Sequence, residues 1–379
     1  MAEKDTPYSW DESEKRAQTD VHKCPSCGSN MTFDPEKQVL ACPFCGQTVD
    51  FKKDSDVKER DILTAFDTAE KWEDTSVVSC DNCGAKFVIS ENDVALECPY
   101  CGTSHVRKSA DLAGVKPNAL YPFLISADRA ESLSKKWAKR RIFAPSKFKK
   151  SIEAKNLHGV YEPCFTFDSR TFSSYDGKLG ETKTRTVRTK NGTRTETYVE
   201  WHYVSGTISH FFDDVTIAAG KELDQKAYNK ISPFDISTIK VYSKDYLAGY
   251  SAKHYDKSLK DAWQESKGIM DERLRKLILE QNGCDVIGYL NVSTVHNDVT
   301  FKYVLLPLYL LNYRYKKKNY KVAVNGNTGR VVGKTPVSFW RVLIAVILGI
   351  GVVAGLLYLF YNYGEFSVEL NAFNSLLLR

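Results

Sequence analysis

The chain has 379 residues, of which 42% are hydrophobic and 26% are charged, and its formal net charge is +6. At roughly 100–200 residues per domain, this length allows two or three domains, and the apolar content excludes global disorder. A mean hydropathy of −0.37 excludes a multispanning membrane protein. Ten cysteines are too few for a disulfide-stapled scaffold of this length.

Charge is distributed unevenly along the chain. Residues 1–20 carry six acids and three bases, and residues 21–105 carry fifteen acids and eight bases, so the remaining 274 residues carry a net charge of +16. Such an asymmetry affects which partners each part attracts. Residues 1–20 have no apolar segment of the kind found in signal peptides, and they are predicted to form a disordered acidic leader.

Eight cysteines form two copies of one pattern, offset by 56 residues. Each copy has two Cys-x2-Cys pairs separated by fourteen residues, and a glycine follows every pair. A Cys-x2-Cys turn directs two thiolates at one ion about 2.3 Å away, and the glycine permits a left-handed backbone. The spacing resembles the zinc-ribbon family and predicts two four-cysteine sites, with ligands Cys24, Cys27, Cys42 and Cys45 in the first and Cys80, Cys83, Cys98 and Cys101 in the second.

We therefore expect two Zn2+ ions, one in a ribbon over residues 21–52 and one in a ribbon over residues 77–106, with iron as the alternative metal. A redox dithiol would instead need one pair near a βαβ unit. Four thiolates leave no position open for water or substrate, so the ribbons are expected to be structural rather than catalytic. His22 and His105 lie outside both ligand sets and are interpreted as surface residues.

The apolar residues between Asp54 and Asp74 predict a helix that links the two ribbons over residues 53–76. The ribbon segment has a net charge of −7, and two zinc centres of four thiolates each bring it to about −11. Phosphate backbones require the opposite sign, which disfavours nucleic acid as the ligand of the ribbons. A basic protein surface, either of a partner or of this chain's own body, fits better.

Residues 107–338 are expected to form an α+β body with an antiparallel sheet. Ser126 is the predicted N-cap of a helix that carries Leu133 and Trp137. The run of bases from Lys135 to Lys150 is either a solvated face or a surface that faces an anion. Residues 160–168 are typical of a strand.

A hairpin and a long helix follow in the same body. Thr182 to Trp201 alternates around Asn191-Gly192, a two-residue turn that predicts a β-hairpin. The bases of this segment fall on both faces, so we interpret it as a hairpin in solvent, with a nucleic-acid or lipid finger as the alternative. From His254 to Gln281 apolar residues recur with a period of 3.6, which predicts a helix that ends at Asn282-Gly283.

Residues 339–361 are predicted to form one transmembrane helix. Val342 to Phe360 is nineteen residues without a charge, close to the ~20 needed to span a bilayer core. A buried core helix is the alternative, which this length and the basic flank disfavour. Nine bases and no acid lie from Lys302 to Arg341, so the positive-inside rule places the N-terminal domains in the cytoplasm. The protein is then single-pass and tail-anchored at the cell membrane, with residues 362–379 as a short extracytoplasmic tail.

Bases interleaved with tyrosines lie close before the span: Arg314, Lys316, Lys317, Lys318 and Lys321. We expect them to adhere to anionic lipid headgroups, at ~1 kcal/mol per basic residue near the surface. Bases with aromatic residues also bind single-stranded nucleic acid. Their position beside the span favours lipid.

Together these features resemble a bacterial family of membrane-anchored double zinc-ribbon proteins, with ribbons of the transcription-factor-IIB type. The resemblance covers Cys24 to about Phe360 and rests on the two ribbons, the strand ending in Asp168, the stretch from Tyr246 to Tyr250, and the terminal span. It implies zinc and a membrane anchor but no particular activity. The primosomal replication-restart helicase also has cysteine knuckles, but this chain lacks a nucleotide-binding motor, and the likeness is limited to the knuckles.

No nucleotide fingerprint, nucleophile elbow or paired-carboxylate motif stands out in the sequence, so hydrolase or transferase activity has no motif behind it. We expect a non-enzymatic zinc-binding scaffold or recruitment protein on the cytoplasmic face of the membrane, whose ribbons contact an unknown protein partner and whose body lies against membrane lipids. The alternative is a membrane-tethered nucleic-acid-binding protein related to replication or transcription, with an affinity that falls steeply with salt.

Overall fold

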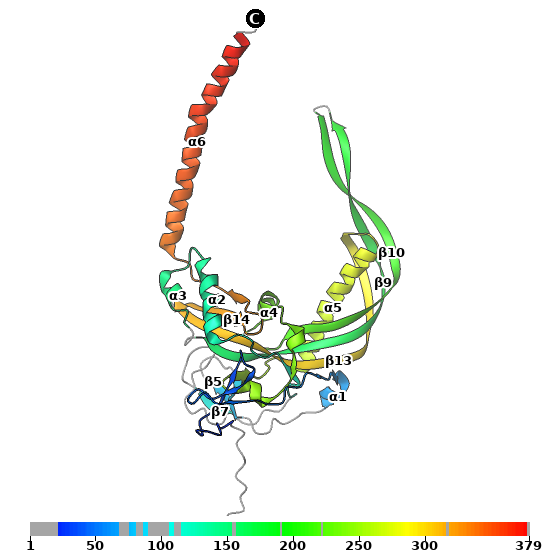
Figure 1. The fold of residues 1–379 in the computed structure, drawn as a ribbon. Coiled ribbons are helices and arrows are strands. Elements are labelled where there is room, and N and C mark those ends of the chain that lie inside the picture. Colours follow the sequence, from blue (N-terminus) through cyan, green and yellow to red (C-terminus); the bar gives the residue numbers. More distant parts are fainter. Residues whose placement is uncertain are drawn as a thin grey trace, which may run out of the picture.

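The computed structural model describes residues 22–67, 76–80, 86–89, 106–109, 115–153, 157–189, 192–220, 223–315 and 318–376. These residues form a mixed α+β structure with mostly antiparallel sheets and one apolar C-terminal helix. The fold class expected from the sequence is confirmed at this level. Figure 1 shows the arrangement, in which the long strands run through the centre and the C-terminal helix projects from one end.

The N-terminal cysteine module (residues 22–51) contains a small antiparallel sheet of three strands in the order β1-β2-β3. Its strands are β1 (Thr32–Asp34), β2 (Val39–Ala41) and β3 (Thr48–Val49). The Asp34 carboxylate accepts hydrogen bonds from the backbone N–H groups of Glu36 and Lys37, at 2.9 and 3.1 Å, and closes the turn between β1 and β2. Gln38 completes this turn with a φ of 56°.

The linker helix predicted for residues 53–76 is found only over the short α1 (Ile62–Asp67). Residues 51–59 have no helix, and residues 68–75 lie outside the described part of the chain. Strand β4 (Arg60–Asp61) pairs with the main sheet at Thr300 and Phe301, so the backbone just before α1 is extended. The Asp61 carboxylate then accepts from the backbone N–H of Leu63 and of Thr64, both at 3.0 Å, which begins the helix where the strand ends.

Three strands represent the second cysteine segment among the described residues: β5 (Ser76–Cys80), β6 (Lys86–Ile89) and β7 (Val106–Ser109). β5 pairs antiparallel with both β6 and β7, and β6 joins the main sheet through β12 (Ser251–Lys253). Cys80 is buried at the end of β5. Cys83, Cys98 and Cys101 lie outside the described residues, and so does His105.

The main sheet is built on three very long strands in the order β10-β9-β13, paired antiparallel throughout. They are β9 (His158–Thr189), β10 (Gly192–Ala218) and β13 (Val286–Tyr315). At about 3.3 Å per residue, the 32 residues of β9 reach on the order of 100 Å. The hairpin predicted around Asn191-Gly192 is confirmed, since Gly192 pairs with Thr189 and takes a φ of 124°.

Two β-bulges interrupt the long strands at the same level of the sheet. The register of β10 against β9 shifts between Phe212 and Val215, and that of β13 shifts between Asn297 and Thr300. Asp214 in the first bulge and Asp298 in the second have φ angles of 51° and 50°. Bulges bend strands and increase their twist. In Figure 1 the three strands curve upward into an arm that ends in the β9–β10 hairpin.

Helix α5 (Leu259–Gln281) lies on the inner side of this curve, as Figure 1 shows. Its stripe of buried residues is the one that the 3.6-residue period predicts, and it includes Leu259, Ala262, Trp263, Met270, Leu274 and Ile278. The helix begins later than His254 because the Ser258 hydroxyl caps it, accepting from the backbone N–H of Asp261. It ends at Asn282, and Gly283 follows with a φ of 64°, as predicted.

The remaining elements complete the other end of the sheet. The strands are β8 (Ala119–Leu120), β11 (Lys240–Val241), β14 (Lys318–Asn325) and β15 (Val331–Gly333), and the helices are α2 (Ala127–Lys139), α3 (Ser146–Lys150), α4 (Gln225–Ile231) and the short η2 (Ile236–Thr238) and η3 (Lys244–Leu247). Ser126 caps α2 as predicted, because its hydroxyl accepts from the backbone N–H of Arg129.

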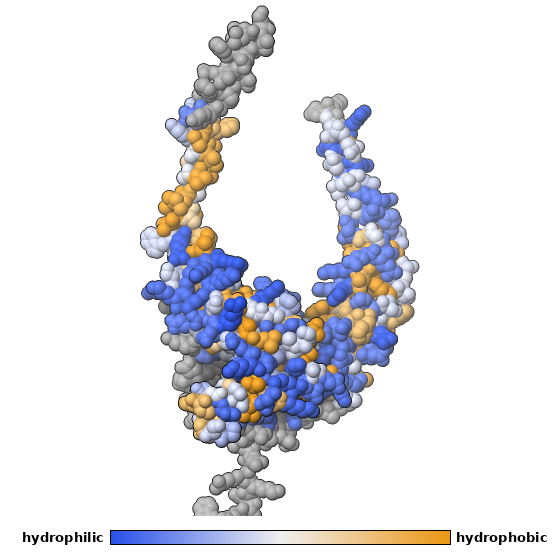
Figure 2. Space-filling view, viewed as in Figure 1, coloured by the Kyte–Doolittle hydropathy of each residue, from blue (hydrophilic) through white to orange (hydrophobic). Residues whose placement is uncertain are grey.

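Helix α6 (Phe339–Leu376) leaves the body at this end. Its segment Phe339–Asn362 is long and apolar enough to cross a membrane, and none of that segment is buried against the body. The apolar surface of this segment contrasts with the mostly polar upper part of the β9–β10 arm (Figure 2). The helix continues beyond the predicted boundary at residue 361 into the segment predicted as a tail.

Candidate metal centre and its attachment to the sheet

The four cysteines of the N-terminal cysteine module converge on one point. The Sγ atoms of Cys24, Cys27, Cys42 and Cys45 all lie within 4.8 Å of one another. Cys24 Sγ is 3.4 Å from Cys45 Sγ, and Cys27 Sγ is 3.5 Å from Cys42 Sγ. Two members, Cys24 and Cys42, are buried, and the other two are exposed. The structure therefore brings the first predicted ligand set together, although its outermost members, Cys24 and Cys45, are 21 residues apart in sequence.

Each Cys-x2-Cys pair forms a tight knuckle. The backbone N–H of Gly28 donates to the Cys24 carbonyl at 2.8 Å, and that of Gly46 donates to the Cys42 carbonyl at 3.0 Å. Both glycines lie in the left-handed region, with φ angles of 71° and 76°. A side chain at either position would find space but would strain the backbone. This is the reason why a glycine follows both cysteine pairs of this module.

The donor set of the cluster suits a divalent cation. The contact of the Cys27 side chain with Ser29 lowers the pKa of Cys27 to about 6. The Gln47 backbone N–H favours ionisation of Cys45, but Cys24 and its other neighbours raise the pKa of Cys45 to about 12. Four adjacent thiols cannot all ionise without a cation, because like charges repel. A bound metal ion would hold all four as thiolates in a closed tetrahedral set.

The module is docked on the main body by an aromatic cluster. Phe33 and Phe51 pack edge-on against Tyr246, with ring centroids 5.2 and 4.9 Å away. Phe33 also donates its backbone N–H to the Ala248 carbonyl at 2.9 Å. Gly249, with a φ of 83°, passes so close to Thr32 that a Cβ would lie 2.9 Å from its methyl group. The stretch from Tyr246 to Tyr250 that stands out in the sequence is thus the docking site of the module.

Polar contacts surround the aromatic cluster. His22 Nε2 lies 2.8 Å from Asp245 Oδ1, and this contact lowers the pKa of Asp245. Gln38 donates its side-chain N–H to the Phe123 carbonyl at 2.7 Å, and the Ser126 hydroxyl donates to Glu36 at 2.8 Å. His22 thus contacts the body through Asp245, a role in docking that the sequence did not indicate.

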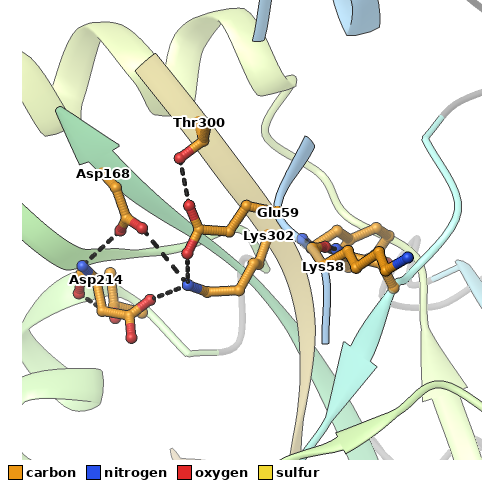
Figure 3. A network of polar contacts seen from close by, with 9 residues as sticks. Lys58, Glu59, Asp168, Asp214, Thr300 and Lys302 are labelled. Atoms are coloured by element: carbon orange, nitrogen blue, oxygen red, sulfur yellow. Dashed lines mark hydrogen bonds and ion pairs between the residues drawn. The ribbon is translucent and has the colours of Figure 1, made fainter. Parts of the chain in front are cut away.

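A second attachment is the buried charge network around Lys302 (Figure 3). Lys302 Nζ lies 2.7 Å from Asp214 Oδ1, 2.8 Å from Glu59 Oε1 and 3.7 Å from Asp168 Oδ2. Thr300 donates its hydroxyl to Glu59, and Asp214 donates its backbone N–H to Asp168. The linker, β9, the β10 bulge and β13 are thereby joined at one point. Sequence analysis missed this network, although a lysine in the apolar run from Phe301 to Leu306 was the available signal.

One ammonium group faces three carboxylates in this network. The pKa values of two of these carboxylates, Asp168 and Glu59, shift in opposite directions. Burial, helped by the contact with Glu59, raises the pKa of Asp168 to about 7. Burial opposes ionisation of Glu59, but its contacts with Asp168, Lys302 and Thr300 lower its pKa to about 2. Burial likewise opposes the charge on Lys302, yet Asp214 and Glu59 raise the pKa of this lysine above its usual value.

Two further polar groupings in the described part of the chain have structural explanations. Glu181, Glu200 and His202 gather on the arm, but Lys183 contacts both glutamates there. Ser169 Oγ lies 3.2 Å from His296 Nδ1, but Ser169 is fully buried and cannot meet a substrate. Two other bases of the arm, Arg185 and Arg194, both contact Glu196.

The predicted lipid-contact residues lie at the junction of β13 and β14. Arg314 is near the end of β13, and Lys318 and Lys321 are exposed on β14. Lys316 and Lys317 lie outside the described residues. The described positions thus belong to one hairpin of the main sheet.

Comparison with known proteins gives one informative similarity. The chain is 28% identical over 335 residues to a Bacillus subtilis (strain 168) protein named as the uncharacterised protein YdjG, and the alignment covers 85% of this chain and 91% of that protein. An alignment of this length extends well beyond the cysteine segments and includes most of the body. No protein-family model matches, and no solved structure matches.

Replacing Cys27 by serine should remove one metal ion from the protein. Three thiolates hold a divalent ion much less tightly than four, and the released module loses its fold because metal binding is coupled to folding. We expect the metal content of the purified full chain to fall by one ion per chain in elemental analysis. Cys284→Ser, which changes a thiol outside both ligand sets, should leave the metal content unchanged; an equal loss there would contradict the assignment.

Replacing Tyr246 by alanine should detach the N-terminal cysteine module without emptying its metal site. A buried aromatic residue truncated to alanine costs about 3–5 kcal/mol, and here the loss falls on the docking contact. We expect faster proteolysis within residues 50–59 and unchanged metal content. Tyr228→Ala, on α4 and remote from the module, serves as the control. Equal protection of the linker in both variants would count against docking through Tyr246.

The attachment of the linker should weaken as pH rises from 5 to 8. The folded state raises the pKa of Asp168 to about 7, so its contribution is full below the unfolded value and is lost as pH rises through about 7. Glu59, with its pKa lowered to about 2, loses its contribution only at acidic pH. Hydrogen exchange in residues 54–61, corrected for intrinsic rates, should therefore accelerate across this range.

Asp168→Asn should flatten this pH dependence, because the amide can still accept from the Asp214 backbone N–H but does not titrate. Asp213→Asn, which alters an exposed carboxylate beside the network, should preserve it. A pH dependence that survives in Asp168→Asn would exclude Asp168 as its source.

Proposed function

We propose that the protein is a non-enzymatic zinc-binding scaffold or recruitment protein, anchored to the cytoplasmic face of a membrane, whose cysteine modules contact a protein partner. The proposed cofactor is two Zn2+ ions. Cys24, Cys27, Cys42 and Cys45 would hold the first, and the second set would begin at Cys80. A closed set of four thiolates gives zinc a structural role, since no position is open for a reacting molecule.

The membrane anchor in this proposal is α6. The segment Phe339–Asn362 has a mean hydropathy of 2.8 and no burial against the body, which supports a bilayer rather than a protein core as its surroundings. The excess of bases before it supports a cytoplasmic location for the body. The charged β9–β10 hairpin would stay in the aqueous phase, because charged side chains and open strand edges are costly in a bilayer.

Phe44 is the single observation that carries the recruitment role. It lies in the second knuckle, between Cys42 and Cys45, and its side chain is 81% exposed. Phe33 and Phe51 of the same module are turned toward Tyr246, so the module places two aromatic rings on the body and presents a third outward. A rigidly held, exposed aromatic ring is a frequent anchor in protein interfaces. The acidic charge of the cysteine segments favours a partner with a basic surface.

Phe44→Ala should abolish recovery of the partner while leaving the scaffold intact. Loss of an aromatic anchor costs at least about 2 kcal/mol, or roughly thirtyfold in affinity. We would crosslink the full chain in its native membranes and quantify the attached proteins by mass spectrometry. Leu63→Ala removes an apolar residue of α1 that is 69% exposed, and it serves as the matched control.

The proposal requires the metal content and membrane content of Phe44→Ala to equal those of the unaltered chain. If the same proteins are crosslinked in equal amount by Phe44→Ala and by the unaltered chain, the knuckle is not the recruiting surface. Nucleic acid in the crosslinked material, in place of protein, would favour the nucleic-acid-binding alternative.

A further inference from the structure

The corner between α2 and α3 (residues 135–150, here called the α2–α3 corner) is joined to the first turn of α6. Arg341 donates from its guanidinium group to the carbonyls of Ile142 and Ala144, at 3.0 and 2.7 Å, and to the Ser146 hydroxyl at 2.8 Å. Ser338 donates its backbone N–H to the Phe143 carbonyl at 2.8 Å. Four hydrogen bonds thus hold the corner against the base of the helix, across almost 200 residues of sequence.

These bonds determine how deep the corner lies relative to a bilayer. Arg341 immediately precedes Val342, the first residue of the uncharged run. A charged residue at this position belongs in the headgroup region. The carbonyl groups bonded to Arg341 must lie at the same depth, whatever the tilt of the helix. Figure 1 shows the ends of α2 and α3 beside the start of α6.

The surface of the corner has the composition of a membrane interface. Between Glu131 and Glu153 there are eight bases and no acid, namely Lys135, Lys136, Lys139, Arg140, Arg141, Lys147, Lys149 and Lys150. Lys135 contacts Glu131, but Lys136, Lys139 and Lys147 have no acidic partner in the part of the chain that the structure describes. Ile142 is 66% exposed beside these bases, and Trp340 of α6 is 70% exposed.

The corner is also rigid before any lipid is met. Phe148 and Ala144 are buried in the main hydrophobic core, so α3 is fixed to the body. Arg141 lies over the ring of Trp137, with 5.1 Å between the guanidinium carbon and the ring centroid. Because this surface is already ordered, its binding to a ligand costs little conformational entropy.

We infer that the α2–α3 corner is a docking surface for anionic lipid headgroups, which binds the membrane next to the anchor. The inference rests on the proposed membrane insertion of α6 and adds a lipid class and a set of residues to it. The unpaired bases would contact phosphate groups, and Ile142 would enter the boundary of the acyl chains. Nucleic acid is disfavoured at this surface, because an anionic bilayer at the same depth would repel it.

The test uses the full chain in nanodiscs and compares phosphatidylcholine with phosphatidylcholine containing phosphatidylglycerol. Hydrogen exchange of the peptide covering residues 140–150 is followed by mass spectrometry. One basic contact is worth about fivefold in affinity, so we expect exchange to slow at least about fivefold with phosphatidylglycerol, and the effect to disappear at high salt. The hairpin residues 182–200 should not respond.

Two triple variants, each of which removes three positive charges, distinguish binding at the corner from general electrostatic attraction to the membrane. Lys139→Gln, Arg140→Gln and Lys147→Gln together should remove the protection by phosphatidylglycerol. Lys260→Gln, Arg273→Gln and Lys276→Gln together, all on the exposed side of α5, should retain it. Glutamine is a good helix former and all six positions are solvent-accessible, so both variants should fold.

Three outcomes would overturn the inference. Equal exchange in both kinds of nanodisc means that the corner does not recognise anionic lipid. Protection by single-stranded RNA in phosphatidylcholine nanodiscs, without an effect of phosphatidylglycerol, means that the corner binds nucleic acid. Failure of the chain to enter nanodiscs of either composition contradicts the anchor itself, which distinguishes failure of the proposed function from failure of the corner alone.

Discussion

The ion pairing of the Lys302 ammonium group is the interaction on which the arrangement of the linker and the long strands depends. It lies at the level where β10 and β13 bulge on either side of β9, and it is paired with carboxylates from the linker, β9 and the β10 bulge. An ammonium group buried without such partners would cost several kcal/mol. In the structure, Glu59, Asp168 and Asp214 supply these partners. The extra residue of the bulge matters because side chains alternate along a strand, and one inserted residue changes which side chains meet Lys302.

The same network gives the N-terminal cysteine module a fixed place. The linker is held by Glu59 and β4, and the module itself by Tyr246 and the backbone at Ala248. These contacts are aromatic and polar, and the ionic contact among them pairs His22 of the module with Asp245 of the body. Docking uses only one side of the module, and the knuckle that carries Phe44 remains in solvent. A scaffold that recruits a partner benefits from this arrangement, since the partner is presented in a defined orientation to the body.

The proposed contact with the membrane combines segments that are far apart in sequence. The bases before the span are sequence neighbours of α6, and those at Lys318 and Lys321 lie on a hairpin of the sheet. The α2–α3 corner is remote in sequence, yet Arg341 bonds directly to it. One arginine therefore both flanks the apolar run of α6 and links this helix to the body. This dual role explains why a charged residue at the helix start makes three side-chain hydrogen bonds in place of being fully solvated.

The sequence by itself determined the local features, because each depends on neighbouring residues. The four-cysteine cluster follows from two knuckles and their glycines, α5 from its 3.6-residue stripe, and the β9–β10 hairpin from Asn191-Gly192. The apolar α6 follows from nineteen uncharged residues. The linker helix was predicted too long, since the pairing of β4 with β13 outweighs helical periodicity there. Only the tertiary structure decided the Lys302 network, the docking at Tyr246 and the bond from Arg341 to the α2–α3 corner. Each of these contacts joins residues from distant strands and loops. Their proximity is set by sheet register, and register is not encoded in any local pattern.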